Sequence, residues 1–148
     1  MKEETTLKST KRGFISITPQ ELDKLVCNAE GTSEECCGFL LGHDRGIKSV
    51  KQIIPARNVA FSDRHLRFEV DPLEYLRAEK FAAAAKMDLL GIYHSHPEAP
   101  AVPSETDRLN AQACFSYVIL SVCGRHVTEI RSWRLNHLHQ FEEETFIL

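Results

Sequence analysis

GIYHSHPEAPAVPSETD, residues 91–107, joins an apolar segment to a proline-rich turn and then to a run of small polar residues. If residues 89–94 form a strand, its two-residue period places the imidazoles of His94 and His96 on one face. The turn then brings the carboxylate of Asp107 back toward them. Two imidazoles and one carboxylate are three ligands of a catalytic zinc site, in which water takes the fourth position. The stretch therefore predicts a zinc centre at the end of a buried strand.

Length and composition are those of an ordinary globular chain. The 148 residues fit one domain with its own core, so we expect a flexible tail over residues 1–12 and a single domain over 13–148. The net charge of -3 leaves no excess of Lys and Arg to neutralise phosphates, which argues against nucleic acid as a partner. No segment approaches the roughly 18 apolar residues of a membrane span, and the first dozen residues lack an apolar signal core. We therefore expect a cytoplasmic protein.

The cysteines favour free thiols over a disulfide scaffold or a structural zinc finger. There are five, an odd number, and no two have the spacing C-x-x-C. We expect small buried side chains in a reducing cytosol, with a cysteine nucleophile or redox sensor as the alternative. The five are Cys27, Cys36, Cys37, Cys114 and Cys123.

Helix starts are marked twice by the same formula of cap, proline and acid. Thr18-Pro19-Gln20-Glu21 and Asp71-Pro72-Leu73-Glu74 each supply a capping side chain, a proline suited to the first turn and a glutamate for a capping box. The first helix should end at Gly31 and the second near Met87, and a third should run from Ser104 to about Ala113. The apolar faces predicted for the first two are Leu22, Leu25, Val26 and Ala29, then Leu73, Leu76, Phe81 and the alanines at 82–85.

Strands are predicted wherever short apolar or alternating segments lie between turn signals. Those before the third helix are 14–17, 38–42, 47–54 (ended by Pro55), 67–70 and 89–94. A hairpin of 117–122 with 127–135 follows, and a last strand covers 140–144. Strands that alternate with helices, followed by a late hairpin, predict a mixed α/β (α+β) fold with helices packed on a mixed sheet.

A zinc centre that performs hydrolysis also needs a carboxylate that carries protons and does not bind the metal. Glu34 and Glu35 precede the buried strand at 38–42 and are the best candidates. Glu98 and Glu105 lie nearer to the two histidines in sequence, but we expect each of them to be a solvated loop residue. Composition and spacing do not choose between Glu34 and Glu35.

The segments at 94–97 and 104–107, His-Ser-His-Pro and Ser-x-x-Asp, resemble the signature of the JAMM metalloproteases, also called MPN-plus or Mov34/MPN/PAD-1 domains. Residues 35–42 resemble the glutamate segment of that family, in which the catalytic glutamate lies three residues before the first glycine. This resemblance selects Glu35 over Glu34. It extends from about Phe14 to the C-terminus, so it covers nearly the whole chain.

The resemblance implies a role for each matched position. His94, His96 and Asp107 would bind Zn²⁺, Glu35 would be the general acid/base, and Ser104 would donate a hydrogen bond to the oxyanion. It also implies a curved mixed β-sheet flanked by helices, similar to that of cytidine deaminases. Family members cleave the amide or isopeptide bond after the Gly-Gly tail of ubiquitin or a ubiquitin-like protein.

The compact chain has no room for the long insertions of eukaryotic deubiquitinating members, so it resembles the short prokaryotic ones. Those are similar to peptidases of the CysO-cysteine type, which act on ubiquitin-like sulfur carrier proteins. The resemblance thus implies a sulfur carrier with a C-terminal Gly-Gly as the partner. The loop from Arg57 to Arg67 is our candidate for part of the cleft, with a plain surface loop as the alternative.

Three other classes of protein fit the sequence less well. A zinc deaminase needs His-x-Glu followed by Pro-Cys-x-x-Cys, and the chain has neither. The DNA-repair family of RadC type has a related motif with a glycine-rich turn, whereas the turn here carries prolines and no glycine. A non-catalytic MPN scaffold is expected to have lost at least one ligand, and this chain keeps all three.

Overall fold

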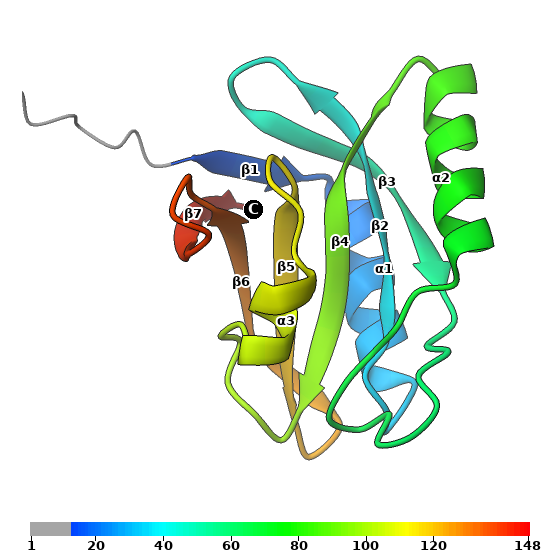
Figure 1. Cartoon of the computed structure of the whole chain (residues 1–148), viewed down its shortest axis with the longest axis vertical. Coiled ribbons are helices and arrows are strands. Elements are labelled where there is room, and N and C mark those ends of the chain that lie inside the picture. The colour runs from blue at the N-terminus through cyan, green and yellow to red at the C-terminus, as the bar shows by residue number, and fades with distance from the viewer. Residues whose placement is uncertain (1–12) are drawn as a thin grey trace, which may run out of the picture.

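The computed structural model describes residues 13–148, so the tail predicted at 1–12 lies outside the described residues. Within this part of the chain a mixed sheet closes into a barrel in the strand order β1-β3-β2-β4-β5-β6-β7 (Figure 1). Its pairs are antiparallel except β1 with β3, β1 with β7, and β4 with β5. The predicted mixed α/β fold is confirmed.

The elements are β1 (Phe14–Ile17), α1 (Pro19–Glu30), β2 (Cys37–Asp44), β3 (Lys48–Ala56), α2 (Pro72–Ala84), β4 (Asp88–Pro97), α3 (Glu105–Asn110), β5 (Ser116–Cys123), β6 (His126–Leu135) and β7 (Phe141–Ile147).

Strand β4 is central, because it pairs with β2 on one side and with β5 on the other. Its alternation separates two cores. Tyr93 belongs to the core that α1 covers, and its hydroxyl donates to Asn28 of α1 at 2.7 Å. Ile92 belongs to the second core, beneath α2. His94 and His96 follow Ile92 at intervals of two residues, so both imidazoles point to the same face of β4 as Ile92, the face that α2 covers.

The contact between β4 and β5 requires a glycine at position 91. A Cβ built there would lie 1.8 Å from the carbonyl oxygen of Ser116, a backbone atom that cannot rotate away. This close approach fixes how near the two parallel strands run. It therefore also sets the position of the strand that ends in the histidines.

Helix α1 begins as predicted, with Thr18 as its cap and Gly31 after its last turn. Its glutamate has a different role from the predicted one. Glu21 is buried, and its Oε2 accepts a hydrogen bond from the backbone N–H of Ile53 on β3 at 2.8 Å. The carboxylate therefore fastens the helix to the sheet, and Leu25 and Ala29 supply the buried apolar contacts.

Helix α2 has the predicted cap at Asp71, but of its predicted apolar face only Ala82 is buried. Ala78 and Ala82 are buried against the sheet, whereas Leu73 is 61% exposed. Apolar side chains lie all round this helix, so the sequence pattern alone did not define a face. Small residues face the sheet because they allow the helix backbone to approach closely. Leu76 and Phe81, also predicted to cover the sheet, are exposed.

Several predicted boundaries differ from the structure. Strand β3 continues through Pro55, which lies beyond the part of β3 that pairs with β1; its missing N–H therefore costs no ladder hydrogen bond on that open side. Residues 67–70 form a loop instead of the predicted strand, and α3 ends at Asn110. Strands β2, β4 and β7 extend beyond their predicted ends. No helix within residues 13–148 has the length and apolar composition needed to cross a bilayer.

All five cysteines are free, as predicted. Cys36 and Cys37 are buried, and Cys36 packs in the core beneath α1. The expectation of burial is wrong for the other three, Cys27, Cys114 and Cys123, which are exposed.

Candidate metal centre

Three potential ligand atoms meet at the C-terminal end of β4. The Nε2 atoms of His94 and His96 lie 3.0 Å apart, and Oδ2 of Asp107 lies 3.2 Å from each of them. Ligands bound to zinc at about 2.0–2.1 Å with tetrahedral angles lie about 3.3 Å from one another. The donor set therefore has the spacing and the chemical character that fit zinc, and within residues 13–148 it is the group that could hold a metal ion.

Asp107 is held in place by the start of α3. The Ser104 hydroxyl oxygen accepts a hydrogen bond from the Asp107 backbone N–H at 3.0 Å, and the Ser104 backbone N–H donates to Asp107 Oδ2 at 2.8 Å. This reciprocal pair is a capping box, and its acid is the carboxylate that faces the two imidazoles. The same short-range signal that predicted the helix therefore also orients the carboxylate that is the third candidate ligand.

The proline-rich turn between β4 and α3 is anchored through three consecutive carbonyl groups. Ser121 donates to Ala99 O at 2.6 Å, His96 Nδ1 lies 2.8 Å from Pro100 O, and Trp133 donates to Ala101 O at 3.0 Å. The middle contact orients the His96 ring, because an Nδ1–H that donates to Pro100 leaves Nε2 free to bind a metal. Trp133 is only half-buried, and it supports the turn rather than filling the core.

Glu35 lies beside this centre and Glu34 does not. The Glu35 side chain is 5% exposed, and its Oε1 is 3.9 Å from His96 Nε2. Glu34 is exposed to solvent. The next residue after Glu35 is tied to β4, because the Cys36 backbone N–H donates to the Ser95 hydroxyl at 2.8 Å. Ser95, between the two histidines, thus fixes the glutamate segment from the opposite face of β4.

Burial and mutual contacts shift the titration of these groups. Burial raises the pKa of Glu35 to about 7, although the nearby His96 opposes the shift. Burial lowers the pKa of His94. For His96 burial acts downward as well, but the hydrogen bonds to Asp107 and to the Pro100 carbonyl outweigh it and raise its pKa. Hydrogen bonds from both histidines overcome burial and hold the pKa of Asp107 well below its usual range. The pKa values of Glu35 and His96 are therefore raised, and those of His94 and Asp107 are lowered.

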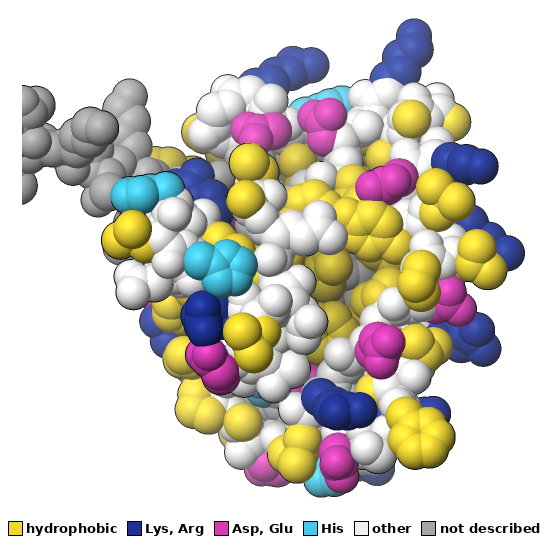
Figure 2. Space-filling model, in the orientation of Figure 1, with side chains coloured by type: hydrophobic (Ala, Val, Ile, Leu, Met, Phe, Trp, Pro, Cys, Tyr) yellow, Lys and Arg dark blue, Asp and Glu magenta, His cyan; other side chains and the backbone are white. Residues whose placement is uncertain are grey.

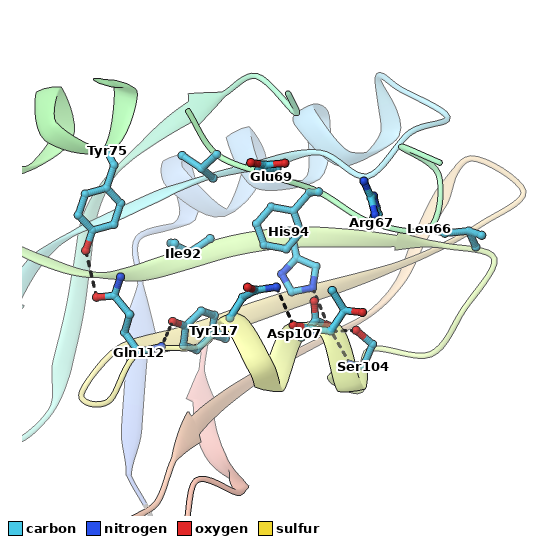
Figure 3. A pocket seen from close by; sticks show the side chains of 14 residues that line it. Leu66, Arg67, Glu69, Tyr75, Ile92, His94, Ser104, Asp107, Gln112 and Tyr117 are labelled. Carbon is cyan, nitrogen blue, oxygen red and sulfur yellow. Dashed lines mark hydrogen bonds and ion pairs between the residues drawn. The ribbon is translucent and has the colours of Figure 1, made fainter. Parts of the chain in front are cut away.

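A groove of about 470 Å³ leads to the centre between α2 and α3. Its metal end has His94, Ser104 and Asp107, and its far end has Tyr75, whose hydroxyl is 3.3 Å from Gln112 Oε1 (Figure 3). Apolar side chains line the hollow between the two helices (Figure 2). The loop proposed for the cleft contributes Leu66 and Arg67 at its edge, and residues 68–70 continue the wall.

A second hollow, of about 210 Å³, lies on the other side of the centre. Glu35 and His96 line it, and Ser104 and Leu66 line both hollows. An extended chain that passes through both hollows would therefore cross the ligand cluster next to Glu35. Most of the remaining lining of this hollow is apolar, from Pro97, Ala99, Pro100 and Val102.

Sequence reasoning did not identify Asn58, Phe68 or Ser95 as parts of this site. Asn58 lies in the loop before α2, which has no periodicity to indicate which side chains turn inward. Phe68 falls in the strand predicted at 67–70, which forms a loop instead. Ser95 was visible only as the residue between two histidines. Because successive side chains of a strand alternate between its two faces, the sequence could have shown only that Ser95 points away from the two histidines.

Comparison with known proteins defines the class to which this fold and centre belong. Residues 21–136 match the family described as prokaryotic homologs of the JAB domain. The chain belongs to this family, and its JAMM-type relatives are hydrolases, as the resemblance implied. The chain is a JAMM-type peptidase by this membership.

Two curated relatives and one solved structure show similarity over most of the chain. The chain is similar to the desampylase of Haloferax volcanii, with 36% identity over 117 residues that cover 75% of this chain and 83% of that protein. It is also similar to the CysO-cysteine peptidase of Mycobacterium tuberculosis, with 33% identity over 103 residues, 69% of this chain and 68% of that one. Among solved structures, that of a Desulfitobacterium hafniense protein superposes with a TM-score of 0.79 at 29% identity, covering 90% of this chain and 92% of that one.

Proposed function

We propose that the protein is a zinc-dependent isopeptidase that hydrolyses the amide bond after the Gly-Gly tail of a ubiquitin-like sulfur carrier protein. The observation that carries the proposal is the meeting of His94, His96 and Asp107 with a separate buried carboxylate, Glu35, at the junction of two hollows. Two relatives, one named a desampylase and the other a CysO-cysteine peptidase, support a ubiquitin-like protein as the class of substrate.

His94, His96 and Asp107 would bind the metal. Zinc in such a site supplies Lewis-acid chemistry, because it lowers the pKa of a water toward about 7 and polarises a carbonyl group. The capping box and the Pro100 carbonyl keep Asp107 and His96 directed inward before any metal arrives. This pre-orientation supports tight binding, because little ordering remains for the metal to impose.

Glu35 is the proposed general acid and base. Its carboxylate takes a proton from the attacking water as the new C–O bond forms. It then delivers that proton to the departing amine as the C–N bond breaks, so the carboxylate is restored. Its burial and its distance from the ligand atoms suit this role, because it lies near the centre without belonging to the group of ligands.

Ser104 is the proposed donor to the oxyanion. Its oxygen already accepts the Asp107 backbone N–H, so its own O–H proton remains available for donation. Ser104 lines both hollows, which supports this role, because a substrate that passes from one hollow to the other would run beside it. A single such donor stabilises charge that develops only during reaction.

The groove supports an extended tail with small side chains next to the bond that is cleaved. The extended loop at 66–70 forms one wall and α3 the other, with the ligands between them. Glycines would pass this region without side-chain clashes, and the end of the groove near Tyr75 would receive residues farther from the bond. The second hollow would then hold the group that leaves.

A pair of glutamate variants tests this assignment. Glu35→Gln should keep zinc at about one ion per chain but lose hydrolysis by about 10²-fold or more, because the amide cannot carry the proton. Glu34→Gln is the matched control, since its side chain is exposed, and it should keep wild-type activity. Zinc content is measured by metal analysis and cleavage by intact mass. Retained activity in Glu35→Gln, or an equal loss in Glu34→Gln, would remove Glu35 from the mechanism.

A further inference from the structure

His94 has an orphaned nitrogen, in contrast with the other histidine of the centre. Its Nδ1 is buried and has no hydrogen-bond partner within residues 13–148, whereas His96 Nδ1 lies 2.8 Å from the Pro100 carbonyl. A histidine that binds metal through Nε2 is ordinarily oriented by a hydrogen bond from its other nitrogen. The orientation of His94 therefore has to come from another contact.

An aromatic ring provides that contact. Phe68 stacks on His94 with the ring centroids 4.5 Å apart and the planes 27° from parallel. A stacked neighbour restricts rotation of the imidazole about its χ2 angle, although it donates and accepts nothing. Phe68 also lines the groove, so its ring separates part of the ligand from the space where substrate would lie.

The backbone on both sides of Phe68 is held by a single side chain. Asn58 Nδ2 donates to Arg67 O at 2.9 Å, and the Glu69 N–H donates to Asn58 Oδ1 at 3.2 Å. Arg67 and Glu69 accordingly lie on the ribbon that passes over His94 (Figure 3). Asn58 Nδ2 also lies 3.1 Å from the Glu35 backbone carbonyl. The loop that carries the ring is therefore fastened to the segment of the proposed base.

We propose that Phe68 is a positioning residue for the metal ligand His94. Its ring takes the place of the missing hydrogen bond, and Asn58 holds the ring over the imidazole. The inference rests on the proposed zinc centre but adds to it a support that the ligand motif does not contain. Phe68 acts through His94 and touches neither the metal nor the reacting atoms.

Zinc affinity of the full-length protein tests this, measured by competition with a chromophoric chelator, together with the visible spectrum of the Co²⁺-substituted protein. Phe68→Ala should weaken zinc binding by about tenfold and change the cobalt spectrum, as loss of an outer-shell partner does. Phe68→Tyr, which keeps the ring, should restore both readouts. Phe61→Ala is the matched control, because Phe61 lies in the same loop and is 96% exposed.

The outcomes separate this inference from the zinc centre itself. Wild-type protein that binds no zinc would contradict both. Wild-type protein that binds zinc, together with a Phe68→Ala variant of equal affinity and unchanged cobalt spectrum, would overturn only the role of Phe68. An equal loss in Phe61→Ala would overturn it as well, since the effect would then belong to the loop in general. If Phe68→Ala does not fold, Phe68→Leu replaces it, and an unaltered affinity in that variant would refute the ring-stacking role.

Discussion

Ser104 has two roles in this account, and a set of substitutions can separate them. Its oxygen caps α3 and so helps to hold Asp107, while its O–H proton is the proposed donor to the oxyanion. Loss of a serine cap costs about 1 kcal/mol of stability. Loss of one oxyanion donor lowers kcat by about 10²–10³-fold, or about 3–4 kcal/mol in the barrier. The catalytic effect should therefore exceed the structural one by a wide margin.

We expect Ser104→Ala to lower kcat by at least about 10²-fold while Tm falls by only about 3 °C. Zinc should remain bound, because the Ser104 backbone N–H that donates to Asp107 Oδ2 is unchanged by the substitution. The assay is steady-state cleavage of a Gly-Gly conjugate, with thermal unfolding and metal analysis of the same samples. KM should change little, because the hydrogen bond forms mainly in the transition state.

Thr18→Ala is the control for the cap, since Thr18 Oγ1 accepts the Glu21 N–H at the start of α1 and lies away from the groove. It should lose similar stability with full activity. The reasoning is refuted if Ser104→Ala loses no more activity than Thr18→Ala. It is also refuted if the loss of activity follows a proportional loss of zinc, because Ser104 would then act only through Asp107.

Three further predictions concern the fold that carries the centre. Gly91→Ala should cost on the order of 3 kcal/mol in urea unfolding, because its Cβ would lie 1.8 Å from the Ser116 carbonyl oxygen; a cost below about 1 kcal/mol would show that the strands can separate. Glu21→Ala should cost about 2 kcal/mol, because it leaves the buried N–H of Ile53 unpaired, whereas Lys24→Ala should cost less than about 1 kcal/mol; equal costs would assign the effect to the ion pair. Burial raises the pKa of Cys36 from 9.0 to about 11, so the unfolded chain releases this proton first and stability falls as the pH rises from about 9 to about 11. Cys36→Ala should reduce that fall by about 2 kcal/mol in urea unfolding under reducing conditions, and an unchanged fall would contradict the assignment.

The sequence predicted those features that depend on neighbours in the chain. The caps at Thr18 and Asp71 need only the next few residues, and the alternation along β4 places His94 and His96 on one face. Ser104 and Asp107 also depend on a local signal, because one capping box both starts α3 and orients the proposed ligand Asp107. Local signals were therefore enough to predict the mixed fold.

Features that depend on tertiary contacts were not predictable from local patterns. Asn58 binds backbone carbonyls of residues 35, 64 and 67, which leave no trace in side-chain periodicity. The buried face of α2 was misassigned because Leu73 and Ala78 are both apolar, and only the distance to the sheet selects the smaller one. The choice of Glu35 over Glu34 likewise needed the family resemblance before the structure brought it beside His96.

The central claim is hydrolysis after a Gly-Gly tail, and intact mass spectrometry tests it most directly. Zinc-loaded protein is incubated with a ubiquitin-like sulfur carrier whose C-terminal Gly-Gly is joined to a further residue or to a lysine side chain. The account predicts a product whose mass ends at Gly-Gly, with no such product from Glu35→Gln or after chelation of the metal. A wild-type sample that binds zinc and leaves the mass of both substrates unchanged would contradict it.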